Sequence, residues 1–87
     1  MINRSRTEII SAMLEAAKGG TTKTRIMFVA FLSYAQLKEY LSILMESGLI
    51  EHIPTDRTFR TTKKGLEFIR TASEISRMTD PMVKVKV

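Results

Sequence analysis

The hydrophobic period of the sequence changes at Gly48, and this change limits the folds open to the chain. Before it, the apolar residues of LSYAQLKEYLSILMES recur every three or four positions, which is the spacing of an amphipathic helix. Ser33 with Gln36 forms a capping-box pattern at the start, and a glycine commonly closes a helix. After it, LIEHI and TFRTT are typical of short strands, and PTDR favours a turn between them. We therefore expect a helix followed directly by a β-hairpin.

Two helices are predicted before this unit. The first spans about residues 4–18 and is ended by the two glycines that follow. Its apolar stripe consists of Ile9, Ile10, Met13, Leu14, Ala16 and Ala17. The second helix, KTRIMFVA, follows a capping Thr21 or Thr22. We expect Ile26, Met27 and Val29 to face the core, while the pattern does not place Phe28 and Phe31.

A last helix runs from about residue 62 or 63 to Met78, because Pro81 prevents its continuation. Its apolar side is assigned to Leu66, Ile69, Ala72, Ile75 and Met78. We expect one domain over residues 1–78 and a short tail over residues 79–87, whose MVKVKV forms either a free arm or an added strand. The predicted fold is mainly α with a small β-hairpin (α+β). The order helix, helix, helix, hairpin, helix is that of a winged helix-turn-helix.

Composition argues against several classes of function. The 87 residues contain no cysteine, which excludes disulfides and thiolate zinc sites, and a single histidine, His52, is a poor metal site. No apolar run approaches the roughly 18 residues of a membrane span, so we expect a soluble cytoplasmic protein with no membrane association. No catalytic triad or glycine-rich phosphate loop is present. We expect no enzyme activity, cofactor, metal or small-molecule substrate.

The charge balance favours a polyanionic partner. Fourteen Lys and Arg against nine Asp and Glu give a net charge of +5 and a pI of about 9.9. In a small cysteine-free domain, such a balance is typical of nucleic-acid binding.

Three segments resemble a known family. LSYAQLKEYLSILMESGLIE, the following FRTTKKGLEFI, and KTRIM earlier in the chain are similar to small archaeal winged-helix proteins that include a chromatin-type DNA-binding family. The resemblance covers about residues 5–75. It implies double-stranded DNA as the partner, a role as transcriptional regulator or nucleoid-associated chromatin factor, and a homodimer joined through the C-terminal helix as an antiparallel coiled coil. The five apolar positions of the last helix would form that interface, although the helix has room for only about two heptads.

A winged helix presents the N-terminal half of its third helix to the major groove. The candidate contacts there are Ser33, Tyr34, Gln36, Lys38, Glu39 and Ser42. The Gln36 amide suits a bidentate contact with adenine, and Ser33 with the first-turn amides suits a phosphate. The candidate backbone contacts are Lys23, Arg25, Arg57, Arg60, Lys63 and Lys64. We expect the first four of these to converge beside the exposed side of the third helix.

Two alternatives compete with DNA binding. Glu39, Glu46 and Ile43 on the outer side of the third helix favour a protein–protein interaction module of the same fold. A structural subunit held together by MVKVKV pairing between copies is the other alternative, and deletion of residues 82–87 would test it.

Overall fold

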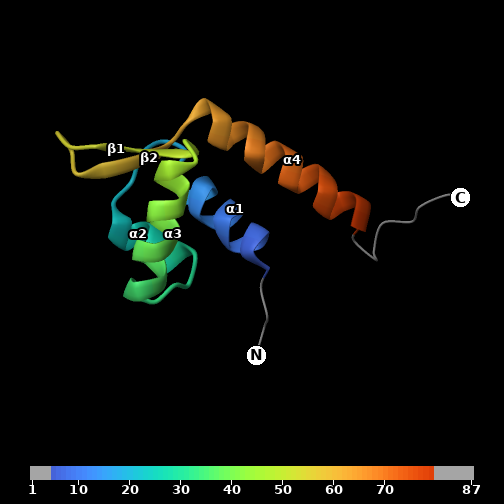
Figure 1. The fold of residues 1–87 in the computed structure, drawn as a ribbon, viewed down its shortest axis with the longest axis horizontal. Helices are drawn as coiled ribbons and strands as arrows, with labels where there is room; N and C mark the ends of the chain where they lie inside the picture. The colour runs from blue at the N-terminus through green and yellow to red at the C-terminus, as the bar shows by residue number, and fades with distance from the viewer. Residues whose placement is uncertain (1–4, 80–87) are drawn as a thin grey trace, which may run out of the picture.

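The computed structural model describes residues 5–79, with side chains described to Ile75. The elements are α1 (Arg6–Ala16), α2 (Lys23–Val29), α3 (Tyr34–Glu46), β1 (Ile50–Ile53), β2 (Thr58–Thr61) and α4 (Lys63–Thr79). This order confirms the predicted helix, helix, helix, hairpin, helix. Figure 1 shows α1, α2 and α3 gathered at one end, with the hairpin and α4 running from them in opposite directions. The MVKVKV tail and the side chain of Met78 lie outside the described part.

Side-chain caps fix where the first three helices begin. At α3 the predicted capping box is confirmed, because Ser33 Oγ accepts from the Gln36 N–H at 3.2 Å and Gln36 Oε1 accepts from the Ser33 N–H at 3.0 Å. Thr22 caps α2. A capping box of Ser5 and Glu8 starts α1 two residues later than the sequence indicated.

The core forms between α1, α2, α3 and the hairpin. The leucines Leu37, Leu41 and Leu44 are buried as predicted, and they pack in one cluster with Met13, Leu14, Ala17, Ile26, Ala30, Leu49, Ile50 and Phe59. The prediction for Val29 was wrong, because its residue is 43% exposed. Ile26 in α2 and Ala30, which caps its C-terminus, lie about 40° apart around the axis and both face the core, which turns Val29 outward.

The wing is a two-stranded hairpin to which a single residue, Thr21, is added by a bridge. Its antiparallel register pairs Glu51 with Arg60 and His52 with Phe59. Thr21, in the connection before α2, forms an isolated bridge with Phe59 through N–H···O bonds of 2.9 and 2.7 Å. The bridge joins β2 to the start of α2.

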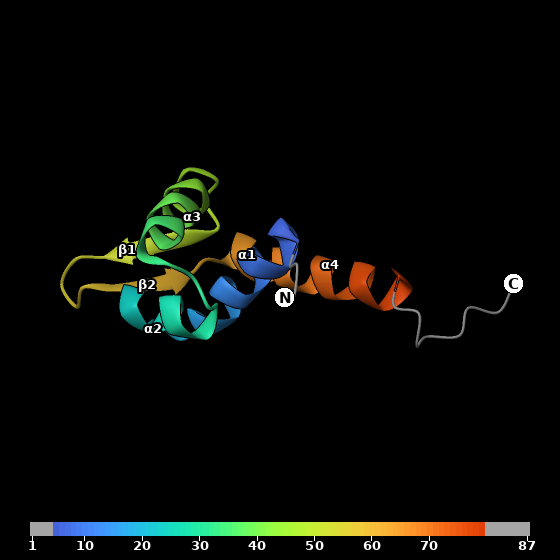
Figure 2. The ribbon, with the colours of Figure 1, turned by 90° about the horizontal axis from the view of Figure 1, so that it is seen from below.

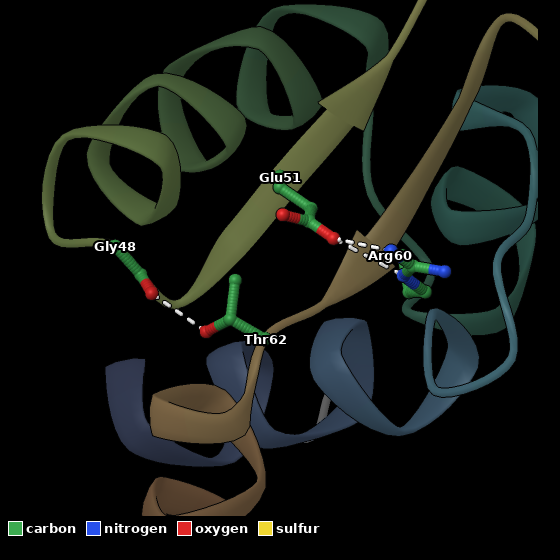
Figure 3. Close-up of polar contacts among 4 residues, drawn as sticks. All are labelled: Gly48, Glu51, Arg60 and Thr62. Carbon is green, nitrogen blue, oxygen red and sulfur yellow. Dashed lines mark hydrogen bonds and ion pairs between the residues drawn. The ribbon is translucent and has the colours of Figure 1, made fainter.

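The C-terminal end of α3 and the start of α4 meet at the base of the hairpin. The Thr62 hydroxyl donates to the Gly48 carbonyl at 2.6 Å (Figure 3). The same hydroxyl accepts from the Gly65 N–H at 3.1 Å. Lys64 Nζ donates to the Ser47 carbonyl at 2.9 Å. Gly48 has a φ of +73°, in the left-handed region that suits a glycine at a helix end. These bonds set the direction in which α4 leaves the core.

The apolar positions of α4 differ in how far they are buried. At about 100° per residue, Leu66 and Ile75 lie about 180° apart around the helix. Ile69 packs against the core and Ala72 is half-buried, whereas Leu66 is 44% exposed and Ile75 is 55% exposed. Ile69 is thus used within the subunit, and the assignment of the five positions to a dimer interface stays a prediction.

Candidate nucleic-acid interface

A lysine–tyrosine cluster lies at the start of α3. Tyr34, the first residue of that helix, is 54% exposed. Lys23 Nζ and Lys38 Nζ each lie 5.7 Å from the centre of its ring, within the range of a cation–π contact. Lys38 reaches the ring from one turn further along α3, and Lys23 reaches it from the first residue of α2. We call Lys23, Tyr34 and Lys38 the lysine–tyrosine cluster.

The fold brings the return strand of the hairpin close to Lys23, one member of this cluster. Lys23 follows the bridging residue Thr21 by two positions, and Arg60 follows Phe59 by one. The bridge therefore joins the backbone near Lys23 to the backbone near Arg60. In both views the hairpin projects beyond α2 and α3 on the side away from α4 (Figures 1 and 2). The return strand and the start of α2, which are separate in sequence, thus lie next to each other.

The outer side of α3 is accessible over most of its length. The exposed residues on this helix include Ala35, Gln36, Lys38, Glu39, Ser42 and Glu46, as the periodicity predicted. In the capping box Gln36 Oε1 is engaged by the Ser33 N–H. A bidentate contact with adenine requires this oxygen as well as the amide nitrogen, so it would require the cap to open. Tyr40, by contrast, packs against the core.

Arg57 and Arg60 occupy different positions in the wing. Arg57 lies in the turn just before β2, with a φ of +54°. Arg60 is paired across the strands with Glu51. Its Nε and Nη2 atoms donate to Glu51 Oε1 at 3.1 and 2.7 Å, respectively (Figure 3). This pair is half-exposed. We did not anticipate it from the sequence, although opposite charges that face each other across a hairpin indicate such a pair once the register is known.

Lys63 and Lys64 lie at the other end of α3. Both are exposed at the start of α4, and Lys64 binds the carbonyl that ends α3. The 13 residues of α3 separate Ser47 from the lysine–tyrosine cluster by about 20 Å. These two lysines are therefore not part of the cluster, and Lys64 has a structural role at the α3–α4 junction.

Metal sites and membrane spans are not found among residues 5–79. Within this range, no group of three or more His, Asp, Glu or Cys side chains is placed to hold a metal ion. The helices of the same range include none that is long and apolar enough to cross a membrane.

Comparison with known proteins supports the fold. A winged helix-turn-helix family model matches residues 3–80. Among solved structures, the chain is similar to the crystal structure of Sso10a-2, a DNA-binding protein from Sulfolobus solfataricus. The TM-score is 0.75 at 24% identity, with 86% of this chain and 81% of that chain covered. No curated protein sequence matches. Residues 5–79 form four helices with a hairpin before the last of them, and the family model matches nearly the whole chain, so the chain belongs to the winged helix-turn-helix family.

Proposed function

We propose that this protein binds double-stranded DNA, as a transcriptional regulator or a chromatin-associated factor of an archaeal cell. The observation that carries the proposal is the lysine–tyrosine cluster, which places two ammonium groups beside the exposed N-terminal half of α3. In a winged helix this half of α3 enters the major groove. The similar protein Sso10a-2 is itself described as DNA-binding.

Each element has a distinct part in this proposal. Tyr34, Lys38 and Ser42 lie on the exposed side of α3, from which side chains can reach base edges. Lys23 and Arg25 on α2 contact the phosphate backbone. Arg57 in the hairpin turn contacts the flanking phosphates. Phosphate contacts of this kind position the protein on the duplex, and contacts with bases supply any sequence preference.

A second candidate function is a protein-interaction module. Glu39 and Glu46 are exposed on α3, and carboxylates on that side repel phosphates. If these residues dominate, the partner is a basic protein surface and duplex DNA does not bind.

The test is a titration of a labelled duplex at several salt concentrations. With four to six phosphate contacts, the affinity falls by about a hundredfold or more between 50 and 200 mM salt. Arg57→Glu combined with Arg60→Glu should abolish binding while the circular dichroism of the fold is unchanged. Arg57→Glu alone has a matched control in Arg70→Glu, which makes the same charge change on α4, the helix that runs away from the hairpin. The proposal is rejected if Arg57→Glu and Arg70→Glu lower the duplex affinity equally, or if the affinity does not change with salt concentration.

A further inference from the structure

The connection between α2 and α3 exposes several large apolar side chains. Phe28 is 71% exposed, Phe31 is 83% exposed and Tyr34 is 54% exposed, with Val29 between them at 43%. The Phe31 N–H donates to the Phe28 carbonyl at 3.3 Å, so the two phenylalanines belong to one tight turn. We call Phe28, Phe31 and Tyr34 the aromatic turn. Exposed apolar surface of this extent marks a binding site in many soluble proteins.

The backbone at Phe31 has a conformation that is uncommon for a residue with a side chain. Its φ of +53° lies in the left-handed region, which residues with a Cβ disfavour and glycine adopts freely. A glycine at this position would adopt the same φ without steric strain and would lack the exposed ring. Backbone outliers of this kind concentrate at functional sites.

The charges around the aromatic turn indicate an anionic ligand. Residues 16–38 contain no Asp or Glu, and their cations are Lys18, Lys23, Arg25 and Lys38. Two of these cations, Lys23 and Lys38, contact the ring of Tyr34. A second copy of the chain is a poor occupant, because a two-fold contact through this surface would oppose like charges.

We propose that the aromatic turn binds single-stranded nucleic acid, with Phe28 and Phe31 stacking on unpaired bases and the neighbouring cations contacting phosphates. Sites for single strands combine these two features, since every base has a face that an aromatic ring can cover. In a duplex the base faces are already stacked on one another, so exposed rings have little to cover there. This is a second ligand class beyond duplex DNA, and it does not depend on the hairpin.

The experiment measures the affinity of the whole chain for labelled oligo(dT), oligo(rU) and a duplex of equal length. The test variant is Phe28→Ala with Phe31→Gly. Alanine suits the exposed helical position of Phe28, and glycine suits the φ of Phe31, so this variant should fold at least as well as the parent. Its affinity for single strands should fall at least about tenfold, while duplex affinity stays within about twofold.

Two further double variants separate stacking from general apolar contact. Phe28→Tyr with Phe31→Tyr keeps both ring faces and should retain single-strand binding. Phe28→Leu with Phe31→Leu keeps apolar surface without rings and should lose it. The two single-strand arms show whether the ribose hydroxyl matters, because oligo(dT) and oligo(rU) present similar base faces.

Four results would overturn the inference. They are no binding of oligo(dT) or oligo(rU) by the parent, full binding by the leucine variant, an equal loss of duplex and single-strand binding, and a change only in self-association. If single strands bind through the rings but duplex does not bind at all, the duplex proposal fails and this inference stands. If duplex DNA binds and single strands do not, this inference fails and the duplex proposal stands.

Discussion

Gly65 stands in the first turn of α4, where helix propensity alone disfavours glycine. The residue is buried. A Cβ built on it would collide with the carbonyl oxygen of Leu49 and lie 2.6 Å from Cγ2 of Thr61. The backbone of α4 therefore touches the backbone that leaves α3, and this contact is possible only without a side chain.

We expect Gly65→Ala to lower the free energy of unfolding by about 1–3 kcal/mol, because a methyl group must displace backbone rather than a flexible side chain. Urea unfolding followed by circular dichroism measures the change. Gly19→Ala is the control, since no heavy atom lies within 4 Å of the point that a Cβ would occupy there and its φ is not positive. That substitution should be neutral or stabilise by up to about 1 kcal/mol. Similar losses at both positions would show that packing at Gly65 is not the cause.

At the scale of single elements, the hairpin contains a conflict between folding and binding. Glu51 holds Arg60 in a pair across the strands, and a phosphate would compete with this carboxylate for the guanidinium. The pair is half-exposed, so it stabilises the hairpin by only about 0–1 kcal/mol. We therefore expect Glu51 to limit duplex affinity more than it supports the fold.

Glu51→Gln should tighten duplex binding by about two- to fivefold, which corresponds to release of a half-exposed pair. If Glu51 acts through Arg60, the same substitution should have little effect in a protein that also carries Arg60→Gln. A gain that persists in that background would instead reflect the loss of one negative charge anywhere near the DNA. Anisotropy titrations of the four proteins at one salt concentration provide the comparison.

The elements also show how far the sequence determines this structure. The start and core side of α3 were predictable because the Ser33–Gln36 cap and the leucine spacing are local properties of one long helix. The orientation of α2 was not, because two turns leave Val29 and Ala30 nearly equivalent until α1 and α3 are in place. The Glu51–Arg60 pair depends on the hairpin register, which the turn sequence did not determine. The candidate surface also depends on tertiary contacts, since the Thr21–Phe59 bridge joins the connection before α2 to β2.

At the scale of the whole molecule, α4 extends away from the other helices. The molecule measures 52 × 31 × 19 Å, and its C-terminal helix continues past α1 (Figures 1 and 2). Phe68 and Ile69 pack against the core near its start, whereas Ile75 is 55% exposed. A domain of this size buries only about 60–65% of its extended surface, so a second copy that covers α4 would add stability. We propose a homodimer through the C-terminal half of α4.

Ile75→Glu should convert this dimer to a monomer, because a carboxylate would be buried against the apolar side of the partner helix. Light scattering after size exclusion, over a range of concentrations, measures the mass. Ser73→Glu adds the same charge at an exposed position on another side of α4, about 160° away, and should leave the mass unchanged. Deletion of residues 82–87 tests the competing arrangement, in which the MVKVKV tails join the copies. A parent chain that is monomeric throughout, or a dimer that Ile75→Glu does not affect but the deletion dissociates, would refute the α4 interface.

In the dimer, two copies of α3 act together, so Ile75→Glu should also weaken duplex binding and reduce its salt dependence, because each monomer makes half of the phosphate contacts.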